Sequence, residues 1–157
     1  MIKTIITNIN ELRKPCQEVT KNDDYKSIIT DLKDTLTTKK GYALASNQIG
    51  IQKRICYCKI PKKINTQTKE VEYNEFVLIN PKIIEKDKPV KFVDEGCLSF
   101  PGLRITTKRY VFCTVTYLDE KLEQRTAMFQ DLESFVIQHE CSHLEGRTLF
   151  EYKWRAK

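Results

Sequence analysis

The residues best suited to chemistry lie close together near the end of the chain. His139 and His143 are the two histidines that the 157 residues contain, and Glu140 directly follows the first of them. On a helix, positions i and i+4 share a face, so both imidazoles can bind one metal ion. The Glu140 carboxylate can then reach a water at that ion as a general base. This spacing predicts a catalytic metal site, with two partly buried structural histidines as the alternative.

A catalytic metal of this kind needs a third protein ligand from another part of the chain. A metzincin pattern would place histidine at position 149, where the sequence has Leu149. Glu145 and Glu151 are the downstream carboxylates, and upstream the candidates are Asp, Glu and Cys. Cys97 is the best of them, because a thiolate and two imidazoles leave a fourth position open for water. A buried structural thiol is the alternative for Cys97.

The segment that carries the two histidines is predicted to be a helix. Asp131 is expected to be its N-cap and Gly146 its C-cap. Leu132, Phe135 and Val136 share the face of the two histidines, so the apolar stripe and the imidazoles should point into the protein.

The preceding elements must position this helix. Apolar residues at helical spacing predict an amphipathic helix over residues 25–36, which Gly41 closes. Strands are expected over residues 53–60, 75–80, 90–93, 110–118 and 122–129, with Pro81 ending the second of them. Residues 41–50 read as a packed loop or short strand, and 61–70 as a hairpin loop or mobile insertion. One domain over residues 1–157 is expected, an α+β fold with antiparallel strands packed around a central, buried C-terminal helix.

Composition sets limits on the class of protein. A hydrophobic fraction of 40% and a charged fraction of 31% favour a soluble globular domain. No apolar run predicts a membrane helix or a signal peptide, so a cytoplasmic location is expected. The six cysteines suit a reducing compartment, and Cys56 and Cys58 are expected to fill the core. The net charge of +6 is read as an ordinary surface, or as weak attraction to an anionic partner such as RNA.

Three segments, taken in order, resemble the three motifs of peptide deformylase. They are Gly41-Tyr-Ala-Leu-Ala-Ser-Asn-Gln48, Glu95-Gly-Cys-Leu-Ser99 and Gln138-His-Glu-Cys-Ser-His143. The flanking pieces that also resemble the family are Leu12-Arg-Lys-Pro15, Val77-Leu-Ile-Asn-Pro81 and Gly146-Arg-Thr-Leu-Phe150. The resemblance covers nearly the whole chain, and a joint match of three motifs is highly specific.

The resemblance implies a metal-dependent hydrolase that removes the N-formyl group from the formylmethionine of nascent peptides and releases formate. The metal ligands that it implies are Cys97, His139 and His143. Glu140 would be the acid/base, while the Gln48 side-chain amide and the Leu98 backbone N–H would donate to the oxyanion. The family metal is typically Fe²⁺, and Zn²⁺, Ni²⁺ or Co²⁺ would suit the same donors. A zincin-like metallopeptidase that cleaves internal peptide bonds is the alternative function.

The resemblance also places a pocket for the methionine side chain around the metal. The residues expected to border it are Tyr42, Ala43, Gly96, Arg104, Phe135 and Val136. Phe135 and Val136 lie one turn before His139, so their side chains should border the metal site, with a plain core role as the alternative. Arg104 is expected either to order the Glu95 loop or to border the pocket, with a surface position as the alternative.

The expected partners are N-formylmethionyl nascent peptides and, weakly, the ribosome. A monomer without membrane contact is expected, in the bacterial cytosol or in an infected host cell if the chain is phage-encoded. The chain resembles short organelle-type or phage-encoded family members that lack a C-terminal helix. Ala43, Ser46 and Ser142 depart from the family motifs, which usually have Gly, Ala and Asp there. A methyl group at position 43 is expected to alter substrate fit or loop conformation.

Overall fold

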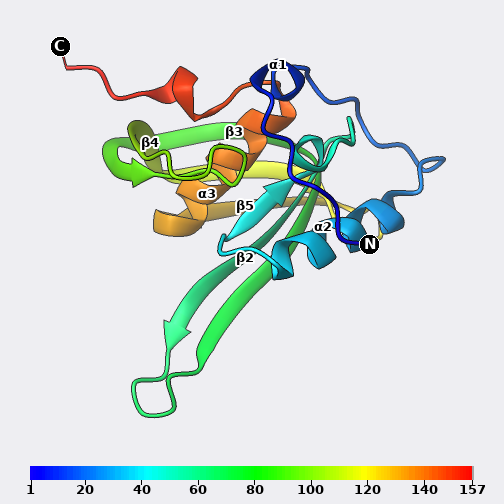
Figure 1. Ribbon diagram of the computed structural model, residues 1–157. Coiled ribbons are helices and arrows are strands. Elements are labelled where there is room, and N and C mark those ends of the chain that lie inside the picture. The colour runs from blue at the N-terminus through cyan, green and yellow to red at the C-terminus, as the bar shows by residue number, and fades with distance from the viewer. Residues whose placement is uncertain (157) are drawn as a thin grey trace.

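Five antiparallel strands form one sheet in the computed structural model, which describes residues 1–156 (Figure 1). The strands, in sheet order, are β1 (Ala43–Ala45), β2 (Ile55–Ile64), β3 (Val71–Glu95), β4 (Ile105–Leu118) and β5 (Gln124–Gln130). The helices are α1 (Ile9–Leu12), α2 (Tyr25–Thr37) and α3 (Asp131–Leu144). Two short 3-10 helices are η1 (Ser46–Ile49) and η2 (Leu149–Tyr152). The α+β class with an antiparallel sheet and a C-terminal helix is thus as predicted.

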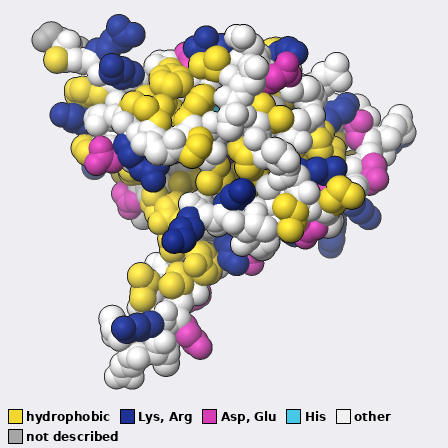
Figure 2. Space-filling model, in the orientation of Figure 1, with side chains coloured by type: hydrophobic (Ala, Val, Ile, Leu, Met, Phe, Trp, Pro, Cys, Tyr) yellow, Lys and Arg dark blue, Asp and Glu magenta, His cyan; other side chains and the backbone are white. Residues whose placement is uncertain are grey.

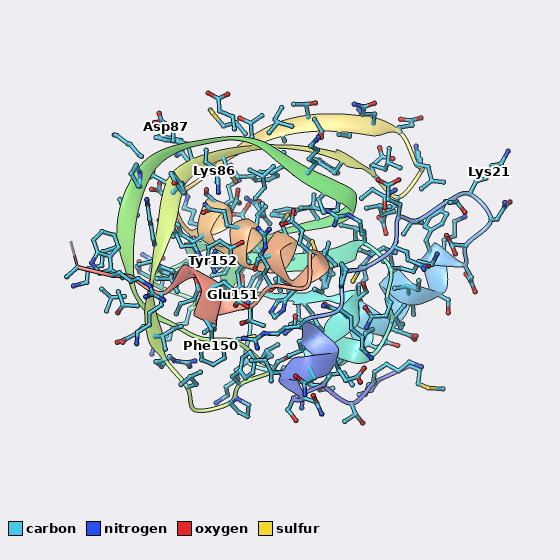
Figure 3. The ribbon with its side chains drawn as sticks, turned by 90° about the horizontal axis from the view of Figure 1, so that it is seen from above. Lys21, Lys86, Asp87, Phe150, Glu151 and Tyr152 are labelled. Carbon is cyan, nitrogen blue, oxygen red and sulfur yellow. The ribbon has the colours of Figure 1, made fainter. Side chains whose placement is uncertain are left out.

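Helix α3 lies inside the curve of the sheet, and the long strands bend around it when the molecule is seen from above (Figure 3). Its residues Ile137, Cys141 and Leu144 are buried in one core cluster with Cys56 and Cys58 of β2. The two strand cysteines therefore fill the core as expected. A helix held on several sides in this way cannot shift without disturbing the sheet, so it offers a rigid support for side chains.

Helix α2 covers the other end of the sheet. Asp24 caps it by accepting a hydrogen bond from Ser27 N, and Ile29, Leu32 and Leu36 are buried against β1 and β2. The amphipathic pattern therefore predicts this helix correctly. The helix ends at Thr37, a turn before Gly41, so the predicted end of the helix lies too far along the chain.

Strand β3 differs most from expectation. The prediction that Pro81 ends a short strand, with a separate strand over residues 90–93, is wrong, because one strand runs from Val71 to Glu95. The pairing with β4 shifts between Ile79 and Lys82, so the missing N–H of Pro81 falls where the regular ladder is interrupted. Pro89 pairs with Tyr110 beyond the end of β2, where the other edge of β3 is open.

The β2–β3 hairpin projects from the body of the molecule (Figures 1 and 2). Strand β2 continues past Pro61 to Ile64, so the predicted loop over residues 61–70 is too long. The connection over residues 65–70 is closed by Asn65, whose N–H donates to Glu70 O over 2.8 Å. Ile64 and Tyr73 of this hairpin are exposed. Figure 2 shows hydrophobic side chains along the hairpin.

Residues with positive φ lie at both ends of α3. Asp131 is not the N-cap: it is the first helical residue, with φ of 54°, and Gln130 before it makes no side-chain capping bond. The C-cap is Glu145, so the prediction of Gly146 as C-cap is one residue off; Gly146 follows it with φ of 76° and donates its N–H to His143 O. Among residues 1–156, no helix is long and apolar enough to cross a membrane.

Candidate active site

The three predicted metal ligands meet at the centre of the molecule. Cys97 Sγ lies 3.3 Å from His143 Nε2, which lies 3.1 Å from His139 Nε2. One donor atom from each residue falls within 4.8 Å of the other two, and all three residues are buried. Helix α3 supplies both imidazoles from adjacent turns, and the turn after β3 supplies the thiol. These are the donor types that bind Zn²⁺ and Fe²⁺ in proteins.

A buried carboxylate fixes the orientation of the first histidine. Glu95 Oε2 lies 3.1 Å from His139 Nδ1, which leaves His139 Nε2 facing the other donors. Arg109 donates from Nε and Nη2 to the two Glu95 oxygens at 2.8 Å each. Burial alone would raise the pKa of the Glu95 carboxyl, but Arg109 and His139 outweigh it and lower the pKa to about 2. A charged carboxylate behind a histidine is a common support for a metal ligand.

Arg109 was not predicted from the sequence to support the site, and Glu95 was named within a motif but given no role. Arg109 is 1% exposed and its guanidinium lies 4.6 Å from the ring centroid of Tyr152, a residue of η2 labelled in Figure 3. The available signal was alternation along β4, where Thr107 and Arg109 both point inward. An arginine at an inward position of a strand needs a buried carboxylate, and Glu95 was the acid inside a motif.

The two imidazoles of the cluster have opposite electrostatic surroundings. Burial alone would lower the pKa of His139, but Cys97 and Glu95 raise it to about 10. Burial and the neighbouring charge of His139 hold the pKa of His143 well below its usual value, which favours the neutral imidazole that binds metals. The residues present therefore fit a divalent metal by donor type and convergence.

Glu140 stands beside the cluster in a form suited to proton transfer. It is 4% exposed, lines the same cavity as His139, and its Oε2 has no hydrogen-bond partner among the described residues. Burial raises the pKa of the Glu140 carboxyl to about 7, although the nearby charge of His139 opposes this. A carboxyl group with a pKa near neutrality can both accept and return a proton.

Gln48 points its amide donor group at the cluster. Its Oε1 accepts from Ala45 N at 2.9 Å, so its Nε2 faces the opposite way, 3.1 Å from Ser99 Oγ and 3.6 Å from Cys97 Sγ. Short helix η1 holds Gln48 there, and Asn47 of the same turn donates to His143 O at 2.7 Å. The structure therefore ties the first and third motifs together through η1.

A cavity of about 700 Å³ opens beside the cluster. The six residues predicted to border a pocket all line it: Tyr42, Ala43, Gly96, Arg104, Phe135 and Val136. Leu98 lines it too, and the ring of Phe135 stacks on Phe92 with centroids 4.8 Å apart. Arg104 is exposed and lies over Gly96, where an added Cβ would come within 1.7 Å of its Nη1. Arg109, not Arg104, binds Glu95.

The three departures from the family motifs have different surroundings. Ala43 is buried in β1 and lines the cavity. Ser46 is buried and donates through Oγ to Lys53 O, which ties η1 to the loop before β2. Ser142 Oγ donates to His139 O at 2.6 Å, within its own helix. Of the three, only Ala43 lies where it can touch a ligand in the cavity.

The fold and site define the class first: an α+β protein with a buried cluster of one cysteine and two histidines that could hold a metal ion, and an adjoining cavity. Comparison with known proteins supplies the family. The model of the polypeptide deformylase family matches residues 2–156. A peptide deformylase of Clostridium beijerinckii is 38% identical over 93% of this chain and 98% of its own length. That of Aquifex aeolicus is 36% identical over 96% and 87%. The chain belongs to the peptide deformylase family.

Solved structures agree with the fold. A peptide deformylase from Thermotoga maritima superposes with a TM-score of 0.84 at 26% identity, over 99% of both chains. A probable peptide deformylase from Synechococcus phage S-SSM7 gives a TM-score of 0.81 at 27% identity, over 97% of this chain and 99% of that one.

Proposed function

We propose that the chain removes the N-formyl group from the formylmethionine of nascent peptides, releasing formate, at the site between α3 and the turn after β3. The observation that carries this proposal is the convergence of Cys97, His139 and His143 within 4.8 Å, beside the buried Glu140. Family membership supports the reaction class. It also argues against the alternative of a zincin-like peptidase.

The three donors would hold one divalent ion, and we place Fe²⁺ first, with Zn²⁺, Ni²⁺ and Co²⁺ also suited to the set. When bound, such an ion would act as a Lewis acid and lower the pKa of a water molecule bound to it. Glu95 and Arg109 orient the His139 imidazole toward it. Because Glu95 stays ionised, its negative charge also favours a cation at His139.

The remaining steps belong to the chain's own side chains. Glu140 takes the proton of the attacking water and returns it to the amine that leaves. Negative charge develops on the formyl oxygen, where the Gln48 amide and the Leu98 backbone N–H would donate hydrogen bonds. Tyr42, Ala43, Gly96 and Arg104 would border the substrate, and Phe135 and Val136 would receive the methionine side chain, an apolar group that gains from leaving water. The hydrogen bonds to the formyl oxygen strengthen as charge develops there, so they lower the barrier rather than only binding substrate.

The substrate also bears on location and assembly. Formylated chains are produced by translation in bacteria, so we infer that the chain acts in the bacterial cytosol, or in an infected cell if it is phage-encoded. We infer a monomer, because the donors and the cavity come from one chain. Weak ribosome contact would use the scattered lysines of the +6 surface.

The test is formate release from formyl-Met-Ala-Ser by protein loaded with Fe²⁺, Co²⁺ or Ni²⁺. We expect formate and free Met-Ala-Ser as the products. Cleavage of an internal peptide bond without formate would support the peptidase instead. No turnover with any of the three metals would overturn the proposal.

A further inference from the structure

The outer part of the cavity carries an excess of positive charge. Lys39 and Lys40 follow α2, and Arg104 lies just before β4. All three line the cavity and are exposed, and none forms an ion pair with any group in residues 1–156. Cations that lack a partner at the rim of a partly enclosed site act on whatever enters it.

The acids of the same cavity do not cancel this charge. Glu95 is buried and held by Arg109. Glu140 is buried beside the metal cluster, deep in the cavity. Asp94 is the one exposed acid that lines the cavity within the described part of the chain. The rim therefore presents three cationic groups against one anionic group.

The path of a substrate follows from the fixed points of the site. Its formyl group must reach Glu140 and the metal ligands, which are buried. Its methionine side chain suits the apolar surface of Phe135 and Val136 on α3. The peptide that continues from the methionine must then leave by the open side of the cavity, where the cationic side chains lie. The second and third side chains of the substrate are the ones that pass them.

We propose that Lys39, Lys40 and Arg104 make the enzyme select formylated peptides with acidic side chains directly after the methionine and disfavour basic ones. The inference rests on the proposed deformylase function and adds a substrate preference to it. Charges at an exposed rim act through solvent, so the preference must weaken as salt is added.

The test compares three peptides with amidated C-termini: formyl-Met-Asp-Asp, formyl-Met-Ala-Ser and formyl-Met-Lys-Lys. At low salt, kcat/KM should fall in that order, with acidic and basic peptides differing by about tenfold. The difference should lie mainly in KM, because the rim is away from the reacting atoms. At high salt the ratio should shrink to about twofold.

A charge reversal at the rim provides the variant. Lys39→Glu/Lys40→Glu should invert the order of the three peptides. The matched control is Lys21→Glu/Lys26→Glu, which changes the net charge equally at exposed residues that do not line the cavity. Lys21 projects outward from the loop before α2 (Figure 3). The control should keep the wild-type order.

The outcomes separate the two claims. Turnover of all three peptides with equal kcat/KM would overturn the charge preference and leave the deformylase function standing. An inversion of the order in the Lys21/Lys26 control would overturn the role of the rim as well. No turnover of any peptide by metal-loaded protein would overturn both.

Discussion

At the scale of single residues, Cys97 connects the parts of the site. Its Sγ faces His143 Nε2 at 3.3 Å and the Gln48 amide at 3.6 Å, so it touches the helix and η1 at once. Its thiol would be the third metal ligand, because the third motif supplies only His139 and His143. A serine hydroxyl at the same place would be a much poorer ligand for a soft transition metal, since it rarely loses its proton.

Cys97→Ser is therefore expected to reduce metal affinity by more than about tenfold, the loss that removing an outer-shell partner alone can cause. The measurement is metal content after gel filtration, with affinity from competition with a chelator. Cys16→Ser is the control, because Cys16 is a thiol outside the cluster that contacts Gln52. Equal metal content in Cys97→Ser and wild type would show that the third metal ligand is another residue.

At the scale of elements, β4 supports the site from behind. Its inward residues Thr107 and Arg109 both donate to Glu95, which in turn contacts His139 on α3. Strand and helix are thus joined by a chain of buried charged groups. Breaking such a chain by removing one member leaves an uncompensated charge, which costs more than the intact pair contributes.

Arg109→Met should lower the free energy of unfolding by roughly 3–5 kcal/mol, because the Glu95 carboxylate loses its buried partner. Arg125→Met is the matched control: Arg125 pairs with Asp119 and Glu123 on the surface, so its loss should cost far less stability. Urea unfolding followed by circular dichroism measures both. Similar losses in the two variants would contradict the role of Arg109.

The same pair gives a pH dependence with a definite sign. The pKa of Glu95 is lowered from 4.5 to about 2, so the folded state favours the ionised form. Its contribution to stability is present above pH 4.5 and is lost as the pH falls toward 2. The acid-side loss of stability should be smaller in Arg109→Met than in wild type. Parallel stability curves for the two proteins between these pH values would contradict the assignment.

The end of α3 supplies a separate prediction. Gly146 has φ of +76°, and an added Cβ would lie 2.5 Å from Arg13 O. Gly102 has φ of +81° but nothing within 4 Å of an added Cβ. Gly102→Ala should thus cost about 1 kcal/mol from backbone strain alone, and Gly146→Ala about 3 kcal/mol or more. Thermal unfolding compares the stability of the two variants. Equal losses of stability would show that the backbone at Arg13 moves to make room for the added methyl group.

What the sequence could predict depended on the range of the interaction. Local patterns were enough for α2, for the hairpin of β4 and β5, and for the spacing of His139 and His143 on one helix face. Pro81 misled because a proline's effect on a strand depends on the register with β4, which no local pattern contains. For Arg109 the alternation along β4 was a local signal that it points inward, but its partner Glu95 lies on the neighbouring strand β3, so the pair depends on how the two strands align. The convergence of Cys97, His139 and His143 was predictable because the chain has only two histidines and because the segments around all three residues resemble the family motifs.

At the scale of the whole molecule, the sheet curves around α3, and a cavity of about 700 Å³ opens beside this helix. Residues from the segment after α2, from β1, η1, β3 and the turn after it, and from α3 meet at the cavity, so no part of the chain forms the site alone. We propose that residues 1–156 fold as one domain for this reason, and residue 157 of the predicted domain lies outside the described residues. The β2–β3 hairpin extends beyond this body (Figure 1), and Tyr73 on it is one of the residues that line the cavity.

Formate release by wild type and Glu140→Gln, loaded with equal amounts of Ni²⁺, tests the central claim most directly. The control Glu145→Gln removes an exposed carboxylate just past the end of the same helix. We predict that Glu140→Gln keeps its metal and loses about 10²–10⁴-fold in kcat, while Glu145→Gln keeps the wild-type rate. Wild-type turnover in metal-loaded Glu140→Gln would contradict the assignment of Glu140 as the group that moves the proton.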